Sequence, residues 1–79
     1  TETELSFQAE MLPTIIERFG DDIRLAADKD GKYYIRVIVR ISKAFFSWLT
    51  MYEGNIKIKA PESVRQEYIA FLQNLIEKV

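Results

Sequence analysis

Hydrophobic and polar residues alternate with a period of two in several stretches of this chain, the pattern of a strand with one buried face. The longest stretch is 33–41, whose odd positions are Tyr33, Ile35, Val37, Val39 and Ile41. The same alternation runs through residues 3–9, 22–28 and 56–60. The sequence therefore predicts four strands, with Ile23, Leu25 and Ala27 pointing inward from the second.

Between these strands the apolar spacing changes to that of helices. Residues 12–19 carry one apolar stripe at helical spacing, which Gly20 is expected to end. A second helix is expected from Ser42, as its N-cap, to near Gly54, and a third from Pro61 to the end of the chain. Asp28 to Gly31 reads as a hairpin turn in which the glycine takes a positive φ.

The predicted order is β-α-β-β-α-β followed by a helix. Two interleaved β-α-β units joined by a hairpin predict an α+β fold, a ferredoxin-like sandwich of four antiparallel strands with helices on one face. Right-handed crossovers leave the other face of the sheet without these helices. The C-terminal helix is expected either to extend the helical layer or to cover part of that open face.

Composition limits the classes of function. With 79 residues the chain is one domain, 1–79, and because it begins at Thr1 we expect it to be a piece of a longer protein. It has no cysteine and no histidine, which removes thiolate nucleophiles, the usual zinc ligands and the ordinary general base. We therefore expect no catalytic residues, no metal and no cofactor, and not an enzyme.

Charge and hydropathy also constrain the partners. The net charge of −1 gives no overall attraction to nucleic acid or to a membrane. Because the sequence shows neither an apolar run long enough for a membrane span nor a signal peptide, we expect a cytoplasmic protein with no membrane partner.

One face of the predicted sheet gathers basic residues. If odd positions face the helices, the opposite face carries Glu4, Ser6 and Gln8 of the first strand and Ala26 of the second. It also carries five of the eleven basic residues together with two apolar ones, which are Arg24, Tyr34, Arg36, Ile38, Arg40, Lys57 and Lys59. This face is a candidate for binding an anion, a nucleic-acid backbone or an acidic partner, and the alternative is a solvated outer face. Sequence-specific RNA binding is disfavoured because Tyr34 is the only outward aromatic on the central strands.

The second helix carries more large apolar residues than one buried stripe can hold. Phe45 and Leu49 are expected in the core. The remaining aromatics are expected at the rim, where a neighbouring domain or subunit can cover them, and they are Phe46, Trp48 and Tyr52.

Several short motifs follow one another along the chain: the Asp30-Gly31 hairpin, the pair Trp48-Leu49, the alternating Ile56 and Ile58, then Pro61, Val64 and Arg65. Their order and spacing resemble the WCX domain, the C-terminal extension of bacterial WYL-domain transcription regulators. The resemblance covers nearly the whole chain. It implies a parent protein with an N-terminal winged helix-turn-helix that binds duplex DNA and a WYL domain that senses an effector.

Two functions follow as hypotheses. The first is a regulatory and oligomerisation module that forms a homodimer, contacts a WYL domain of the same or a partner chain, and helps transmit effector binding to the DNA-binding domain. The second is a ferredoxin-like sensing domain that binds a small molecule, a nucleotide or a single-stranded oligonucleotide at an interface.

Overall fold

The strands form one antiparallel sheet in the order β2-β3-β1-β4. The structure is a computed structural model that describes residues 1–79. Its elements are β1 (Glu2–Phe7), α1 (Leu12–Phe19), β2 (Ala26–Ala27), β3 (Tyr33–Ile38), α2 (Lys43–Thr50), β4 (Ile56–Ala60) and α3 (Glu62–Glu77). Short 3₁₀ turns at Ala9–Met11 and Lys29–Gly31 complete the chain. The α+β class and the four-stranded antiparallel sheet are therefore confirmed.

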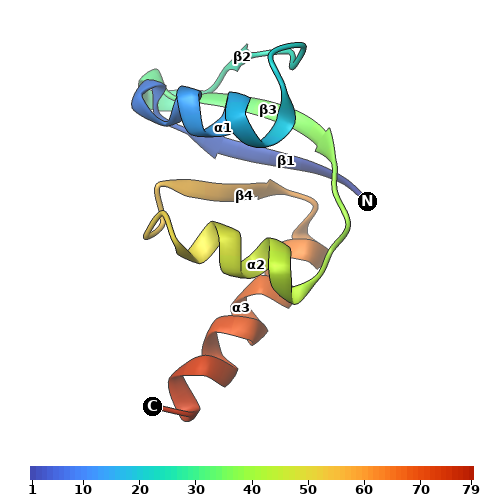
Figure 1. Cartoon of the computed structure of the whole chain (residues 1–79), viewed down its shortest axis with the longest axis vertical. Helices are drawn as coiled ribbons and strands as arrows, with labels where there is room; N and C mark the ends of the chain where they lie inside the picture. The colour runs from blue at the N-terminus through green and yellow to red at the C-terminus, as the bar shows by residue number, and fades with distance from the viewer.

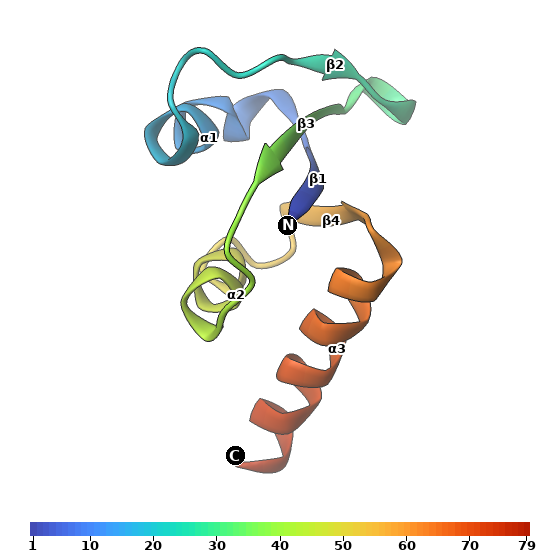
Figure 2. The ribbon, with the colours of Figure 1, turned by 90° about the vertical axis from the view of Figure 1, so that its right-hand side faces the viewer.

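Helices α1 and α2 lie on one side of the strands, as Figure 2 shows most clearly. In Figure 1 they lie in front of the sheet, α1 beside β3 and β1, and α2 beside β4. Helix α3 leaves the β4 edge and runs away from the sheet alongside α2. The third helix thus packs against α2 beyond the β4 edge and does not lie over the outer face of the sheet.

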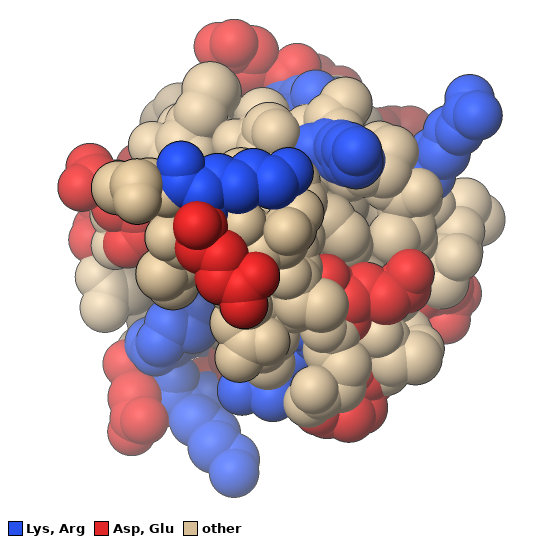
Figure 3. All heavy atoms as spheres, turned by 90° about the horizontal axis from the view of Figure 1, so that it is seen from below, with Lys and Arg blue, Asp and Glu red and all other residues tan.

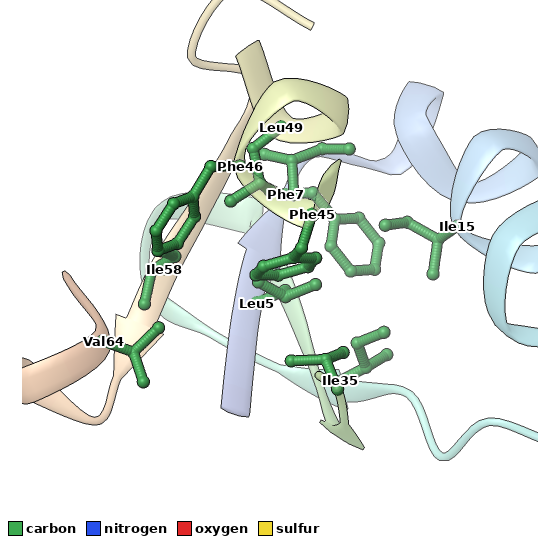
Figure 4. Packing of buried hydrophobic residues seen from close by; sticks show 11 residues of the cluster. Leu5, Phe7, Ile15, Ile35, Phe45, Phe46, Leu49, Ile58 and Val64 are labelled. Atoms are coloured by element: carbon green, nitrogen blue, oxygen red, sulfur yellow. The ribbon is translucent and has the colours of Figure 1, made fainter. Parts of the chain in front are cut away.

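The core lies between the sheet and the helices. The strands contribute alternate residues, the helices contribute single stripes, and the buried hydrophobic set is Leu5, Phe7, Ile15, Ile35, Val39, Phe45, Phe46, Leu49, Ile56, Ile58 and Val64. Figure 4 shows Phe45 and Phe46 of α2 directed toward the side chains of β1, β3 and β4. The alternation of inward residues in β1 and β4 is complete, because every odd residue of β1 and both isoleucines of β4 are buried.

Local chemistry sets the ends of the elements as predicted. The Oγ of Ser42 accepts the N–H of Phe45 at 3.2 Å, which caps α2. Gly31 has φ 73° in the turn before β3, and Gly20 has φ 91° after α1. Both glycines therefore take the left-handed conformation that a larger residue resists.

The second strand is much shorter than predicted. The alternation over 22–28 predicts a full strand, whereas only Ala26 and Ala27 pair with β3. Leu25, expected inside, is 43% exposed and Ala27 is also exposed. The prediction was wrong because residues 22–25 form no backbone hydrogen bond to β3, and burial in this segment does not follow a period of two.

Strand β3 also ends earlier than predicted, at Ile38. Its ladder with β1 continues by one step, because the backbone N–H and C=O of Val39 bond to Thr1 at 3.0 and 2.7 Å. Val39 is buried and Arg40 exposed, so the alternation persists past the end of the strand.

Candidate interaction surfaces

The outer face of the sheet carries charges of both signs in contact. Opposite Arg36 in the β1–β3 register lies Glu4, and a guanidinium nitrogen of Arg36 lies 2.9 Å from its carboxylate. A second acid, Glu2, lies 3.8 Å from the same guanidinium group. This part of the face is therefore an ion-paired cluster on the two central strands.

A second cluster of polar contacts connects the two edges of the sheet. The Nζ of Lys59 in β4 donates to Oδ1 of Asp28 at 2.9 Å, and the hydroxyl of Ser6 donates to Oδ2 of the same carboxylate at 3.1 Å. The ammonium group of Lys59 lies 5.0 Å from the ring centre of Tyr34, within cation–π range. Asp28 thus connects the turn after β2 to β1 and β4.

These contacts shift the acid–base properties of the groups. The hydrogen bond from Lys59 lowers the pKa of Asp28, and the N–H of Lys29 lowers it further. The same Asp28 contact raises the pKa of Lys59, and the hydrogen bond to Glu4 raises the pKa of Arg36. All three groups are held in their charged forms.

The predicted basic face is therefore divided. Arg36, Lys59 and Tyr34 are engaged with neighbours on the sheet. Lys57 shares their face without an ion pair, and Ile38 is 83% exposed. Two members lie outside the strands: Arg24 precedes β2 and Arg40 follows β3.

A groove opens beside β3 where β2 ends. It has a volume of about 530 Å³ and lies between the segment 22–26 and the second half of β3. Its lining includes four of the predicted face residues, which are Arg24, Tyr34, Arg36 and Ile38. Phe19, Ile23 and Val37 supply its apolar part and Asp22 an acid. The structure therefore brings these four residues together around one groove.

The aromatic residues of α2 have different surroundings. Phe46 is only 6% exposed, and its ring packs against Tyr68 and Phe71 of α3 at 5.3 and 5.5 Å. The C-terminal helix of the same chain thus covers Phe46.

Trp48 and Tyr52 are half-buried and pack edge to face at 5.3 Å. From α1, the ring of Phe19 lies nearly perpendicular to the indole of Trp48, with ring centroids 5.6 Å apart. The guanidinium carbon of Arg18 lies 5.1 Å from the ring centre of Trp48. Trp48 therefore joins α1 to α2 and leaves part of its ring accessible at the rim.

An exposed apolar surface lies where α2 meets α3. Met51 is 65% exposed, and Leu75 and Ile76 near the end of α3 are 42% and 71% exposed. A shallow groove of about 220 Å³ runs between the helices, lined by Ser47, Thr50, Met51, Phe71 and Leu75. We call these residues together with Ile76 the α2–α3 surface.

The charges at this end of the molecule do not form a patch of one sign. Figure 3 views the molecule from below, and acidic and basic side chains alternate there among uncharged atoms. Glu62 and Arg65 of α3 pair at 3.3 Å, and the amide of Gln66 lowers the pKa of Glu62 by donating a hydrogen bond at 2.6 Å.

The structure groups no three acidic, histidine or cysteine side chains so that they could hold a metal ion. None of its helices combines the length and the apolar character needed to cross a bilayer.

Sequence reasoning missed two features of these surfaces. The first is the ion pairing of Arg36: the sequence placed Glu4 on the outer face, but it did not predict that Glu4 and Glu2 lie beside Arg36. The second is the α2–α3 surface, which had a weak signal in the sequence, since apolar residues continue along α3 past the positions that the core can cover.

Comparison with known proteins gives the family. The model of the WCX domain matches residues 1–76, which confirms the resemblance seen in the sequence. Comparison with curated proteins and with solved structures gave no match. WCX domains are associated with WYL-domain transcriptional regulators and form a regulatory family that is not known as catalytic. Since the match spans almost the whole chain, this chain belongs to the WCX domain family.

Proposed function

We propose that this chain is a regulatory and oligomerisation module of a WYL-type bacterial transcription regulator. In this role it docks on the WYL domain or on a second subunit and helps transmit effector binding to the DNA-binding domain. The observation that carries the proposal is the match to the WCX family over residues 1–76.

The α2–α3 surface supports docking by this module. Met51 and Leu75 line a shallow groove between the helices and are 65% and 42% exposed, and Ile76, next to Leu75 in the chain, is 71% exposed. Exposed apolar side chains that gather at one groove often mark an interaction site. The half-buried pair Trp48 and Tyr52 adds aromatic area on α2, of the kind enriched in interfaces. We propose that the interface is centred on these helices.

The fold supports the same proposal. The strand order β2-β3-β1-β4, with α1 and α2 on one side, supports a ferredoxin-like topology. In this arrangement the helical layer and the outer sheet face are separate surfaces, so one can dock while the other remains free.

The test is to measure binding of the 79-residue chain to a WYL domain from a regulator that carries a WCX domain, together with its own self-association. We expect sedimentation equilibrium or calorimetry to detect at least one of the two. The double variant Met51→Glu/Ile76→Glu should weaken that association about tenfold or more, because two carboxylates would be buried at the interface.

The matched control is Lys29→Glu, which reverses an exposed charge in the turn before β3, far along the chain from both helices. A chain that stays monomeric at high concentration and binds no WYL domain would contradict the proposal. So would an association that the double variant leaves unchanged.

The second candidate function, sensing of a small molecule or nucleotide, has one supporting observation, the groove beside β3. Its volume of about 530 Å³ is within the range of ligand sites. Binding of a nucleotide phosphate here is disfavoured, because two carboxylates already pair with Arg36. Titration with ATP and with a short single-stranded DNA tests this candidate, and binding that survives Arg24→Ala and Arg36→Ala would place the ligand elsewhere.

A further inference from the structure

The groove beside β3 lies along a free sheet edge. Only Tyr33 and Tyr34 of β3 pair with β2, and from Ile35 onward β3 has no neighbour on that side. The segment 20–25 forms no backbone hydrogen bond to β3, so it lines the groove without closing the edge.

The register shows which backbone groups of β3 face this edge. Val39 exchanges both of its backbone hydrogen bonds with Thr1, so in an antiparallel ladder the other odd residues of β3 also bond to β1. The backbone N–H and C=O groups of the even residues then point away from β1, toward the free edge. Tyr34 is satisfied by Ala26, whereas the N–H and C=O groups of Arg36 and Ile38 point into the groove without a backbone partner.

The side chains around this edge differ on its two faces. Toward the helices the groove is lined by Phe19, Ile23 and Val37, all of them partly buried. Its other lining includes the exposed Ile38 and two exposed charged residues without an ion pair, Arg24 and Asp22. An extended segment lying here would therefore meet apolar groups on the helix side, and Arg24 is the cation that remains available to an acidic side chain.

We propose that this edge binds an extended peptide segment as an added antiparallel strand, in line with β2. The segment donates and accepts backbone hydrogen bonds at Arg36 and Ile38, which needs about three extended residues. Its inward side chains are apolar and contact Val37 and Ile23, and an outward acidic side chain pairs with Arg24. The site is separate from the α2–α3 surface and does not depend on docking to a WYL domain.

The first test is amide hydrogen exchange of the free chain followed by NMR. The N–H groups of Ile35 and Val37 bond to β1 and should be protected. Those of Arg36 and Ile38 should exchange at least about tenfold faster, because nothing in the fold covers them. Equal protection of both sets would mean that the segment 20–25 closes the edge itself, which would overturn the proposal.

The second test is titration with a blocked hexapeptide of alternating glutamate and valine. We expect the amide signals of Arg36 and Ile38 to shift and to become protected as the peptide binds. The same peptide with lysine in place of glutamate should bind about tenfold more weakly, because its charge opposes that of Arg24.

Variants separate the backbone contact from the side chains. Ile38→Pro removes the N–H that faces the groove without removing a bond to β1, and it should abolish peptide binding. Ile38→Ala keeps that N–H and should bind the peptide with a Kd within about threefold of the original. Arg24→Glu should lower the affinity for the glutamate peptide about tenfold and raise the affinity for the lysine peptide.

Three results would overturn the proposal. They are binding that Ile38→Pro leaves intact, a preference for the peptides that Arg24→Glu does not change, and shifts at this edge caused by ATP or single-stranded DNA but not by peptide. If Ile38→Pro does not fold, Arg24→Glu and the exchange rates of the original chain decide the question, because neither alters the ladder with β1.

Discussion

At the scale of single residues, the most connected side chain is Asp28. It accepts hydrogen bonds from Lys59, Ser6 and the N–H of Lys29, and so joins β4, β1 and the turn before β3. The sequence predicted a turn at this position but could not predict these partners. They depend on which strands become neighbours, and the separations of 22 and 31 residues to Ser6 and Lys59 carry no local pattern.

Asp28 should make the free energy of unfolding depend on pH in the acidic range. Because Lys59 lowers the pKa of Asp28 below its ordinary value of 3.8, the unfolded chain binds this proton more readily than the folded chain. The stabilisation is therefore complete above pH 3.8 and is lost as the pH falls through the lower folded pKa. In urea unfolding, the stability difference between the original chain and Asp28→Asn should be constant from about pH 7 to 5 and narrow toward pH 3.

The control for that experiment is Asp30→Asn, which removes a carboxylate from the same turn. Asp30 has φ 59°, a conformation that asparagine also tolerates, and it takes part in no side-chain hydrogen bond or ion pair. A difference for Asp28→Asn that grows as the pH falls would contradict the assigned role of the lysine contact.

The cap of α2 is a second prediction at this scale. Ser42→Ala removes the acceptor for the N–H of Phe45 and should lower the free energy of unfolding by about 1 kcal/mol. Ser47→Ala, in the exposed middle of the same helix, should have an effect near zero or slightly stabilising. Equal losses in both variants, measured by denaturant unfolding, would show that the cap does not stabilise the helix.

At the scale of elements, the period of two was reliable where the inward residues are buried in the core. Strands β1, β3 and β4 and all three helices were predicted, with ends that differ by a few residues. Strand β2 failed because its apolar residues are small or exposed: Ala26 and Ala27 pair with β3, and Leu25 stays at the surface. Pairing of an edge strand depends on its fit to the neighbouring strand, which a one-dimensional pattern does not contain.

Burial changes strongly at the end of helix α2. Leu49 has no exposed surface, whereas Met51, the C-cap residue that follows the helix, is 65% exposed. Leu49→Ala should therefore cost about 2–5 kcal/mol of unfolding free energy, and Met51→Ala less than about 0.5 kcal/mol. Thermal or urea unfolding of both variants checks this, and a large loss for Met51→Ala would show that this side chain is buried in solution.

At the scale of the whole molecule, α3 decides which surfaces remain free. The sequence predicted the helix but not its position, so it assigned Phe46 to the rim, whereas Tyr68 and Phe71 cover that ring. Beyond Leu72 every residue of the helix is exposed. The first part of α3 therefore belongs to the core, and the last part presents apolar residues to a partner.

Shortening α3 should separate these two roles. Truncation after Leu72 removes only exposed residues and should change the free energy of unfolding by less than about 1 kcal/mol. Phe71→Ala should cost about 2 kcal/mol, below the value for a fully buried ring, because Phe71 is partly exposed. Sedimentation should show weaker self-association for the truncated chain, and an unchanged association would place the interface away from the end of α3.

The position of Trp48 gives this domain an optical probe of its own. It is the only tryptophan, its indole touches Phe19 of α1 and Phe45 of its own helix, and part of the ring still reaches solvent. Its fluorescence therefore reports on the contact between α1 and α2 without any attached label. A shift of its emission wavelength on mixing would therefore register a partner that binds at this contact between α1 and α2. Because Phe19 also lines the groove beside β3, a peptide bound there should perturb the same emission.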